Sequence, residues 1–330
     1  MEMINNKSTT SYRHVKVVMA GMAYYSEMPY HSNALYFQSL NSTAYQSCDV
    51  VAHHPYFYTP EGNDANNLFD YETKAKMLLD YLSQFGKEIW ATEWGWSTYN
   101  TNFSEQPFIT MRQQADYILK RMTMLMYLCY DRVYHFTLYD LPVGWGGRDE
   151  FYGLLNATTI SQVAKPSFYA MKNYLSIVGS NLKPVKIIKP LADPGNVHSM
   201  TATNGKDVFW IYWADKDYTN MSINGTEIFG NLNTTNQLVI TTYEPIDGTS
   251  TTTSFSKNIS SISITIKSTL TISQFTLMTT TSPQYSSKPT SSNSTIPLNS
   301  ARTQVSMSNI VGVSWCLFIV ISLFALVHVV

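Results

Sequence analysis

A carboxylate lies among aromatic side chains in the segment from Lys87 to Ser97, which reads KEIWATEWGWS. The apolar run from Ile89 to Thr92 predicts a short buried strand that ends next to Glu93. In α/β barrels, active sites form where the strands end, and indole rings offer stacking faces to sugars. Trp94 and Trp96 supply two such rings directly after the acid. The pattern favours a catalytic carboxylate over the alternative of a surface acid that caps a helix or pairs with a lysine.

Polar side chains also follow the two strands predicted on either side of this one. The run 49–52 leads into the sequence HHPY, which contains His54 and Tyr56. The run 133–138 leads into Tyr139. Three successive predicted strands therefore carry polar or aromatic side chains at their carboxyl ends, where the active sites of α/β barrels form.

The segments between these strands have the periodicity of helices. The predicted helices span residues 33–40, 71–85, 107–130 and 167–177, and a first strand spans residues 15–19. Gly86 is expected to end one helix, and Lys165-Pro166 to open the last. Strand and helix alternating at this spacing predict a parallel α/β sheet. Because three successive strands end in His, Tyr, Glu or Asp, we predict that residues 1–180 form part of a (β/α)8 TIM barrel.

From about residue 181 the pattern changes to short alternating runs, which predict an all-β sandwich over residues 181–279. The predicted strands span residues 185–188, 208–213, 238–243, 262–266 and 272–278. Turn signals separate them, among them Asn204-Gly205 and Asp247-Gly248. Trp210 and Trp213 could bind carbohydrate, but their positions within one strand favour a role in the core or at an interface.

Charge and cysteine content exclude several classes of partner. The chain has 330 residues, with 22 Lys plus Arg against 23 Asp plus Glu, so no net field attracts nucleic acid. An uncharged ligand fits this balance. No Gly-rich phosphate loop is found, and neither a metal nor another cofactor is expected. The three cysteines do not make a disulfide framework, and we expect Cys48 and Cys129 to be buried thiols.

The carboxyl-terminal part predicts attachment to a cell surface. Residues 280–309 are rich in Ser, Thr and Pro and read as a stalk, and residues 310–330 are apolar and uncharged. Small residues at Asn299 and Ser300, a polar spacer and the apolar run match a glycosylphosphatidylinositol (GPI) attachment signal, with a single-pass membrane helix as the alternative. Sequons indicate N-glycosylation in the secretory route, at Asn6, Asn41, Asn102, Asn156, Asn220, Asn224, Asn233, Asn258 and Asn293.

The motifs HHPYFY, ATEWGWS, FTLYD, GLL and KPSFYAMKNYL occur in this order. Over residues 15–180 they resemble the carboxyl-terminal half of clan A glycoside hydrolases, with families 39 and 5 as the nearest relatives. The resemblance implies that Glu93 is the nucleophile of a retaining mechanism. It implies that His54 and Tyr56 hydrogen-bond the nucleophile or the substrate, and that Trp94 and Trp96 line or support the sugar site.

The chain departs from this family pattern in two respects. Phe136 occupies the position where such enzymes usually present a Trp as the floor of the sugar site, with Tyr139 beyond it. The Asn-Glu pair that carries the acid/base is absent from the sequence, and Glu27 follows the wrong strand to replace it. Only four strands are predicted where a barrel needs eight. We therefore expect an amino-terminally truncated barrel that is inactive alone, with a noncatalytic carbohydrate-binding surface glycoprotein as the alternative.

Overall fold

The computed structural model describes residues 15–24, 42–62, 71–101, 106–142, 144, 147–156, 163–185, 197–224, 237–256 and 261–278. Several predictions lie outside these ranges: the helix over 33–40, Glu27, the sequons at Asn6, Asn41, Asn102, Asn233, Asn258 and Asn293, the GPI signal with Asn299 and Ser300, the stalk and the apolar tail. Within the described ranges, no helix combines the length and apolar character needed to cross a membrane.

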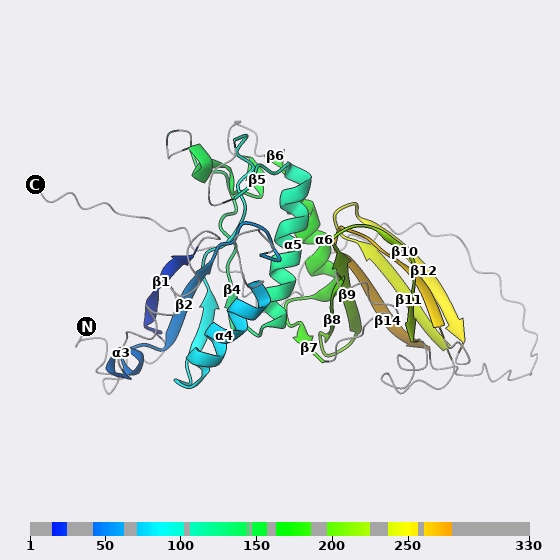
Figure 1. Cartoon of the computed structure of the whole chain (residues 1–330), viewed down its shortest axis with the longest axis horizontal. Helices are drawn as coiled ribbons and strands as arrows, with labels where there is room; N and C mark the ends of the chain where they lie inside the picture. The colour runs from blue at the N-terminus through cyan, green and yellow to red at the C-terminus, as the bar shows by residue number, and fades with distance from the viewer. Residues whose placement is uncertain are drawn as a thin grey trace, which may run out of the picture.

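A parallel sheet in the order β1-β2-β3-β4 forms the first part of the molecule (Figure 1). Its strands are β1 (Val18–Tyr24), β2 (Val50–Pro55), β3 (Glu88–Ala91) and β4 (Arg132–Val133). Parallel neighbours need long crossover connections, and these are supplied by helices. The mixed α/β class is thereby confirmed. That this sheet is half of a closed barrel stays a prediction.

Two of the predicted strands have different bounds in the structure. The strand predicted over 15–19 is found at β1, because β2 continues to Pro55 and offers partners as far as Tyr24. The strand predicted over 133–138 is only β4. Because β3 ends at Ala91, the chain beyond β4 bonds to a loop instead of a strand, with Phe136 N donating to Trp94 O at 2.8 Å.

The helices described beside this sheet are α3 (Ser42–Gln46), α4 (Tyr71–Ser83), α5 (Met111–Tyr127) and α6 (Pro166–Val178). The helix predicted from residue 107 starts later, because Thr110 accepts a hydrogen bond from Gln113 N and forms a capping box. Lys165 and Pro166 open α6 as predicted. A turn follows α5, in which Cys129 has a φ of 60°. Cys129 is exposed there, so the prediction of a buried thiol is wrong for it and confirmed for Cys48.

The second part of the molecule is antiparallel. One sheet has the order β12-β11-β14-β9-β8-β7, and β10 pairs with β13 in another. Their strands are β7 (Lys183–Pro184), β8 (Val197–Thr203), β9 (Val208–Ala214), β10 (Tyr218–Asn224), β11 (Gln237–Glu244), β12 (Thr249–Ser256), β13 (Ser261–Ile266) and β14 (Thr271–Met278). We call residues 183–278 the β-module. β8, β10 and β12 were not predicted from the sequence. β7 ends one residue before the strand predicted over 185–188, of which residues 186–188 lie outside the described ranges.

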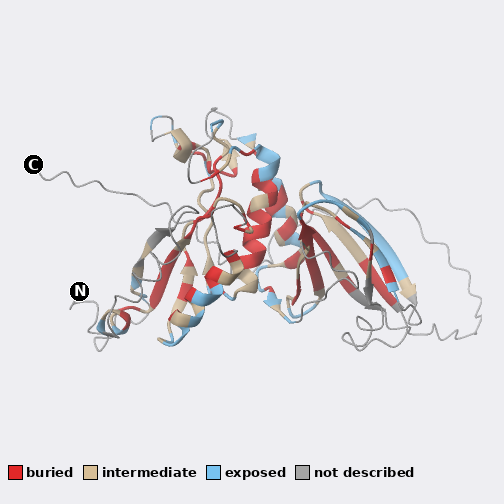
Figure 2. Ribbon diagram, viewed as in Figure 1, coloured by how far each residue is buried: buried red, intermediate tan, exposed pale blue. Residues whose placement is uncertain are grey.

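Strand β9 divides its side chains between two buried clusters. Trp210 and Tyr212 pack inside the β-module with Ile262 and other residues of both sheets. Phe209 and Trp213 belong to the cluster that includes α5 and α6. The buried residues accordingly concentrate along α5 and along the β-module sheet that contains β9 (Figure 2). The prediction of a core or interface role for the two tryptophans is confirmed, whereas a complete sandwich stays a prediction.

Candidate functional site

Glu93 and His54 meet at the carboxyl edge of the parallel sheet. His54 Nδ1 lies 2.8 Å from Glu93 Oε2. His54 lies near the end of β2 and Glu93 follows the end of β3. The two strands are neighbours, since β2 pairs with β3 and Thr92 N donates to His53 O at 3.0 Å. They are 20% and 30% exposed, so a ligand can reach the pair. The contact expected from the sequence is therefore present in the structure.

The imidazole of His54 lies directly against the backbone of Gly21 in β1. A Cβ atom at Gly21 would collide with the Nε2 and Cδ2 atoms of the ring and would also approach Thr92 Oγ1. Only a residue without a side chain leaves His54 in reach of Glu93. Gly21 is a site residue that sequence reasoning missed, although its position within a short apolar strand is the signal of a close approach.

Replacing Gly21 by Ala is expected to displace His54 from Glu93, because the new methyl group and the imidazole cannot occupy the same space. A misplacement of this size lowers turnover by about 10²-fold in enzymes that depend on such a pair. A crystal structure of the variant checks the displacement. Val18→Ala, an exposed position in the same strand, is the control and should leave the pair unchanged. A Gly21→Ala structure that keeps the 2.8 Å contact would contradict this interpretation.

The aromatic residues around the acid lie deeper than the sequence suggested. Trp94 is 0% exposed and Trp96 is 1% exposed, so neither presents a ring face to a ligand. Trp94 packs edge-on against His135, with ring centroids 5.2 Å apart. Trp96 Nε1 donates to Tyr58 O at 3.1 Å. The prediction that these two rings line a sugar site is wrong, because both are buried. A supporting role remains for both.

The other predicted site residues differ in exposure. Tyr56 is buried, with its ring edge-on to Tyr152 at 5.9 Å. Phe136 is half-buried and contacts the same Tyr152 ring at 5.5 Å. Tyr139 is exposed. Tyr152, which no motif pointed to, thus connects two of the predicted residues, and Phe136 and Tyr139 are the predicted aromatic residues that remain open to solvent.

Two histidines beside the pair stay uncharged at neutral pH. Burial, with smaller contributions from His54 and Arg121, lowers the pKa of His53 to about 3. Burial also lowers the pKa of His135 to about 3. Neither imidazole therefore adds a positive charge beside the pair.

A buried arginine holds the loop that follows β2. We call residues 56–62 the β2 loop. Arg121 of α5 is 0% exposed and donates to Pro55 O at 2.6 Å and to Pro60 O at 2.8 Å. Its guanidinium lies 3.5 Å from the centre of the Tyr71 ring. Since Pro55 ends β2, the arginine fixes the chain immediately beyond His54.

Asp140 is not available as a second acid at this site. Its side chain is 1% exposed, and Lys165 Nζ lies 2.6 Å from its Oδ1. Gly153 N donates to the same oxygen at 2.9 Å. Burial raises the pKa of Asp140 in spite of this lysine. The ion pair between Asp140 and Lys165 connects the chain after β4 to the start of α6.

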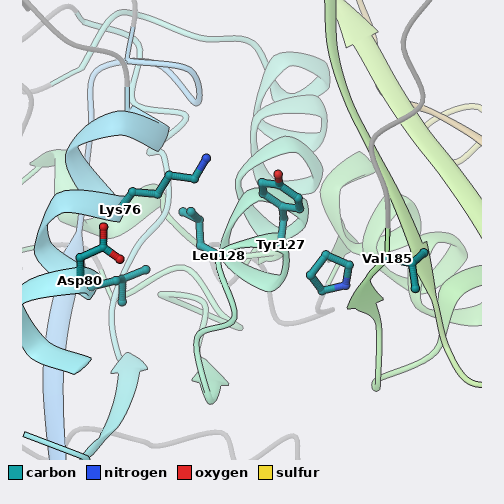
Figure 3. Close-up of a pocket in the computed structure, with 7 residues that line it drawn as sticks. Lys76, Asp80, Tyr127, Leu128 and Val185 are labelled. Atoms are coloured by element: carbon teal, nitrogen blue, oxygen red, sulfur yellow. The ribbon is translucent and has the colours of Figure 1, made fainter. Parts of the chain in front are cut away.

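A cavity of about 440 Å³ lies at the other edge of the sheet (Figure 3). It is lined by residues of α4, of the end of α5 and of β7, among them Lys76, Asp80 and Tyr127. The end of α5 leads into the start of β4, whereas Glu93 follows the end of β3. The cavity is therefore separate from the pair. Among the described residues, no group of three or more His, Cys, Asp or Glu could hold a metal ion.

No protein-family model matches this sequence, and no curated protein matches it. Solved structures with a similar fold include a GH30 endoxylanase from Clostridium papyrosolvens C71, at 14% identity and a TM-score of 0.47, over 84% of this chain and 59% of that one. A β-porphyranase of glycoside hydrolase family 86 from Bacteroides plebeius gives 12% identity and a TM-score of 0.47, over 84% and 50%. A glucosidase from Croceicoccus marinus gives 12% identity and a TM-score of 0.46, over 80% and 61%.

The chain thus spans between 50% and 61% of the length of these three glycoside hydrolases. All three identities are under 15% and all three TM-scores are under 0.5. The resemblance to families 39 and 5 stays a prediction.

Proposed function

We propose that this chain carries the nucleophile half of a retaining glycoside hydrolase site, with Glu93 as the nucleophile. The observation that carries this proposal is the 2.8 Å contact between His54 and Glu93, which is partly exposed at the carboxyl edge of a parallel sheet. A histidine that hydrogen-bonds a carboxylate fixes the direction of its oxygens. A carboxylate oriented in this way can attack an anomeric carbon and form a covalent glycosyl-enzyme.

The mechanism needs a second carboxyl group about 5 Å from the first, to protonate the leaving oxygen. Among the described residues, His54 pairs with Glu93, and Thr92 and Trp94 flank it; none of the three carries a carboxyl group. We propose that four further β/α units provide it and complete the barrel. The edges of the sheet support this, because β1 and β4 are its outermost described strands and a closed barrel has no edge strand. Val18 of β1 is 41% exposed.

We also propose that the protein acts on uncharged carbohydrate at a cell surface, held by a GPI anchor or by a single membrane helix. The GPI-type tail and the sequons support this location. Of the sequons, Asn156 lies in β5 (Leu155–Asn156), which pairs with β6 (Val163–Ala164), and it is partly exposed. Asn220 and Asn224 lie in β10.

Activated substrates test the nucleophile without the acid. 2,4-Dinitrophenolate is a weak base, so it departs from a glycoside without protonation while the Glu93 carboxylate forms its bond to the anomeric carbon. Azide then attacks the same carbon, releases the carboxylate and gives a glycosyl azide with the original anomeric configuration. We expect slow dinitrophenolate release from one glycoside of a gluco, galacto, xylo and manno panel, accelerated by azide.

The product distinguishes the two candidate functions. A glycosyl azide of retained configuration, identified by NMR, supports the nucleophile assignment. If no glycoside of the panel gives azide-dependent release above the uncatalysed rate, the nucleophile proposal is wrong. Binding of the parent sugars by such an inactive chain would instead support a noncatalytic carbohydrate-binding glycoprotein.

A further inference from the structure

A polar cluster lies within the interface between the α/β part and the β-module. Trp213 of β9 donates from Nε1 to Glu61 Oε1 at 2.8 Å. Lys120 of α5 lies 3.5 Å from the same oxygen and 2.8 Å from Asp116 Oδ2. Asp116 Oδ1 accepts from Leu270 N, in the β-module, at 3.0 Å. Both parts of the molecule therefore contribute to one hydrogen-bonded cluster.

The cluster has two carboxylates against one ammonium group, and its side chains are largely buried. The side chains of Glu61, Asp116 and Lys120 are 16%, 11% and 7% exposed. One ammonium group is shared by two carboxylates, so neutral donors must satisfy the remaining oxygens. For Glu61 Oε1 this donor is Trp213 Nε1, at 2.8 Å. If the indole donor is removed, the partner that remains for this oxygen in the cluster is the Lys120 ammonium group at 3.5 Å.

Glu61 belongs to the β2 loop, which begins two residues after His54. The loop is bonded on its other sides to residues of the candidate site. Trp96, three residues after Glu93, donates to Tyr58 O at 3.1 Å. Arg121 donates to Pro60 O at 2.8 Å. The β2 loop thus lies between the Glu93 segment and the β-module and is held from both.

We propose that Trp213 of the β-module is a positioning residue for the candidate site, because it fixes Glu61 and through it the β2 loop that carries Tyr56. The β-module is then a part of the site's architecture and not a separately tethered unit. This proposal rests on the proposed function in one respect, namely that the site next to the β2 loop is the site of Glu93.

Hydrogen exchange of the full chain tests this without any turnover. Trp213→Phe keeps an aromatic ring in the interface and removes the donor to Glu61. Trp210→Phe is the matched control, since Trp210 lies in the same strand, is similarly buried, and its Nε1 has no hydrogen-bond partner among the described residues. We expect exchange of the amides in residues 56–62 to accelerate about tenfold or more in Trp213→Phe and to change less than about threefold in Trp210→Phe.

Variants of Glu61, which accepts the hydrogen bond from Trp213, test the same contact from the other side. Glu61→Gln keeps an oxygen for the indole, so exchange in the β2 loop should stay near wild type, whereas Glu61→Ala should match Trp213→Phe. The double variant Glu61→Ala with Trp213→Phe should exchange no faster than Glu61→Ala, because both remove the same bond. Unchanged exchange in residues 56–62 of Trp213→Phe, or equal acceleration in Trp210→Phe, would overturn the proposal. Either result leaves the azide test of Glu93 unaffected.

Discussion

Glu93→Gln is expected to lower the azide-dependent release of dinitrophenolate by about 10³-fold or more, because an amide cannot form the glycosyl ester. Loss of the nucleophile in a covalent mechanism has effects of this order or larger. Gln has nearly the same shape as Glu and keeps an oxygen for the His54 contact at 2.8 Å. The fold should therefore be preserved, and the loss should come from the chemical step. Initial rates at saturating azide measure it.

Glu88→Gln is the matched control for this experiment. Glu88 lies in β3, the strand that leads to Glu93, and is paired with Lys16. Its substitution removes one carboxylate charge from the same strand but at the opposite edge of the sheet. We expect release rates within about twofold of the unmodified chain. Equal losses in Glu88→Gln and Glu93→Gln would show that charge or stability, and not a nucleophile, governs the rate.

The approach of His54 to Glu93 could be predicted from the family resemblance, and it has a local cause. Strand direction is fixed by the helix between two strands, so the residues at the carboxyl ends of β2 and β3 must meet at one edge. The depth of Trp94 and Trp96 could not be predicted in this way. It depends on segments distant in sequence, such as α5, from which Gln114 Nε2 donates to Trp96 O at 2.8 Å.

The strands of the β-module also differ in how well they could be predicted from the sequence. β9 and β14 have strong apolar patterns and were predicted with nearly correct bounds. β12, with the sequence TSTTTSFS, has hydroxyl groups on both faces and no alternation to detect. It forms a strand because β11 pairs with it over its full length, from Gln237 with Ser256 to Glu244 with Thr249. Pairing with a long neighbour here overrides a weak local signal.

Arg121 is the residue for which we expect the largest loss of stability. Arg121→Met should lower the free energy of unfolding by about 3 kcal/mol or more, because it removes the guanidinium donor from the buried carbonyl groups of Pro55 and Pro60. Met fills a similar volume, so a cavity contributes little. Relief of the desolvation of the guanidinium offsets part of the loss. Urea unfolding followed by circular dichroism measures the difference.

Arg112→Met separates the effect of burial from that of removing a cation. Arg112 lies in the same helix and donates to both oxygens of Asp247, at 2.6 and 2.9 Å, but its side chain is 58% exposed. Exposed ion pairs of this kind contribute up to about 1 kcal/mol. We therefore expect Arg112→Met to cost less than a third of Arg121→Met. Equal costs would mean that the β2 loop does not depend on the buried arginine, and that its position is set by Trp96 and Glu61 alone.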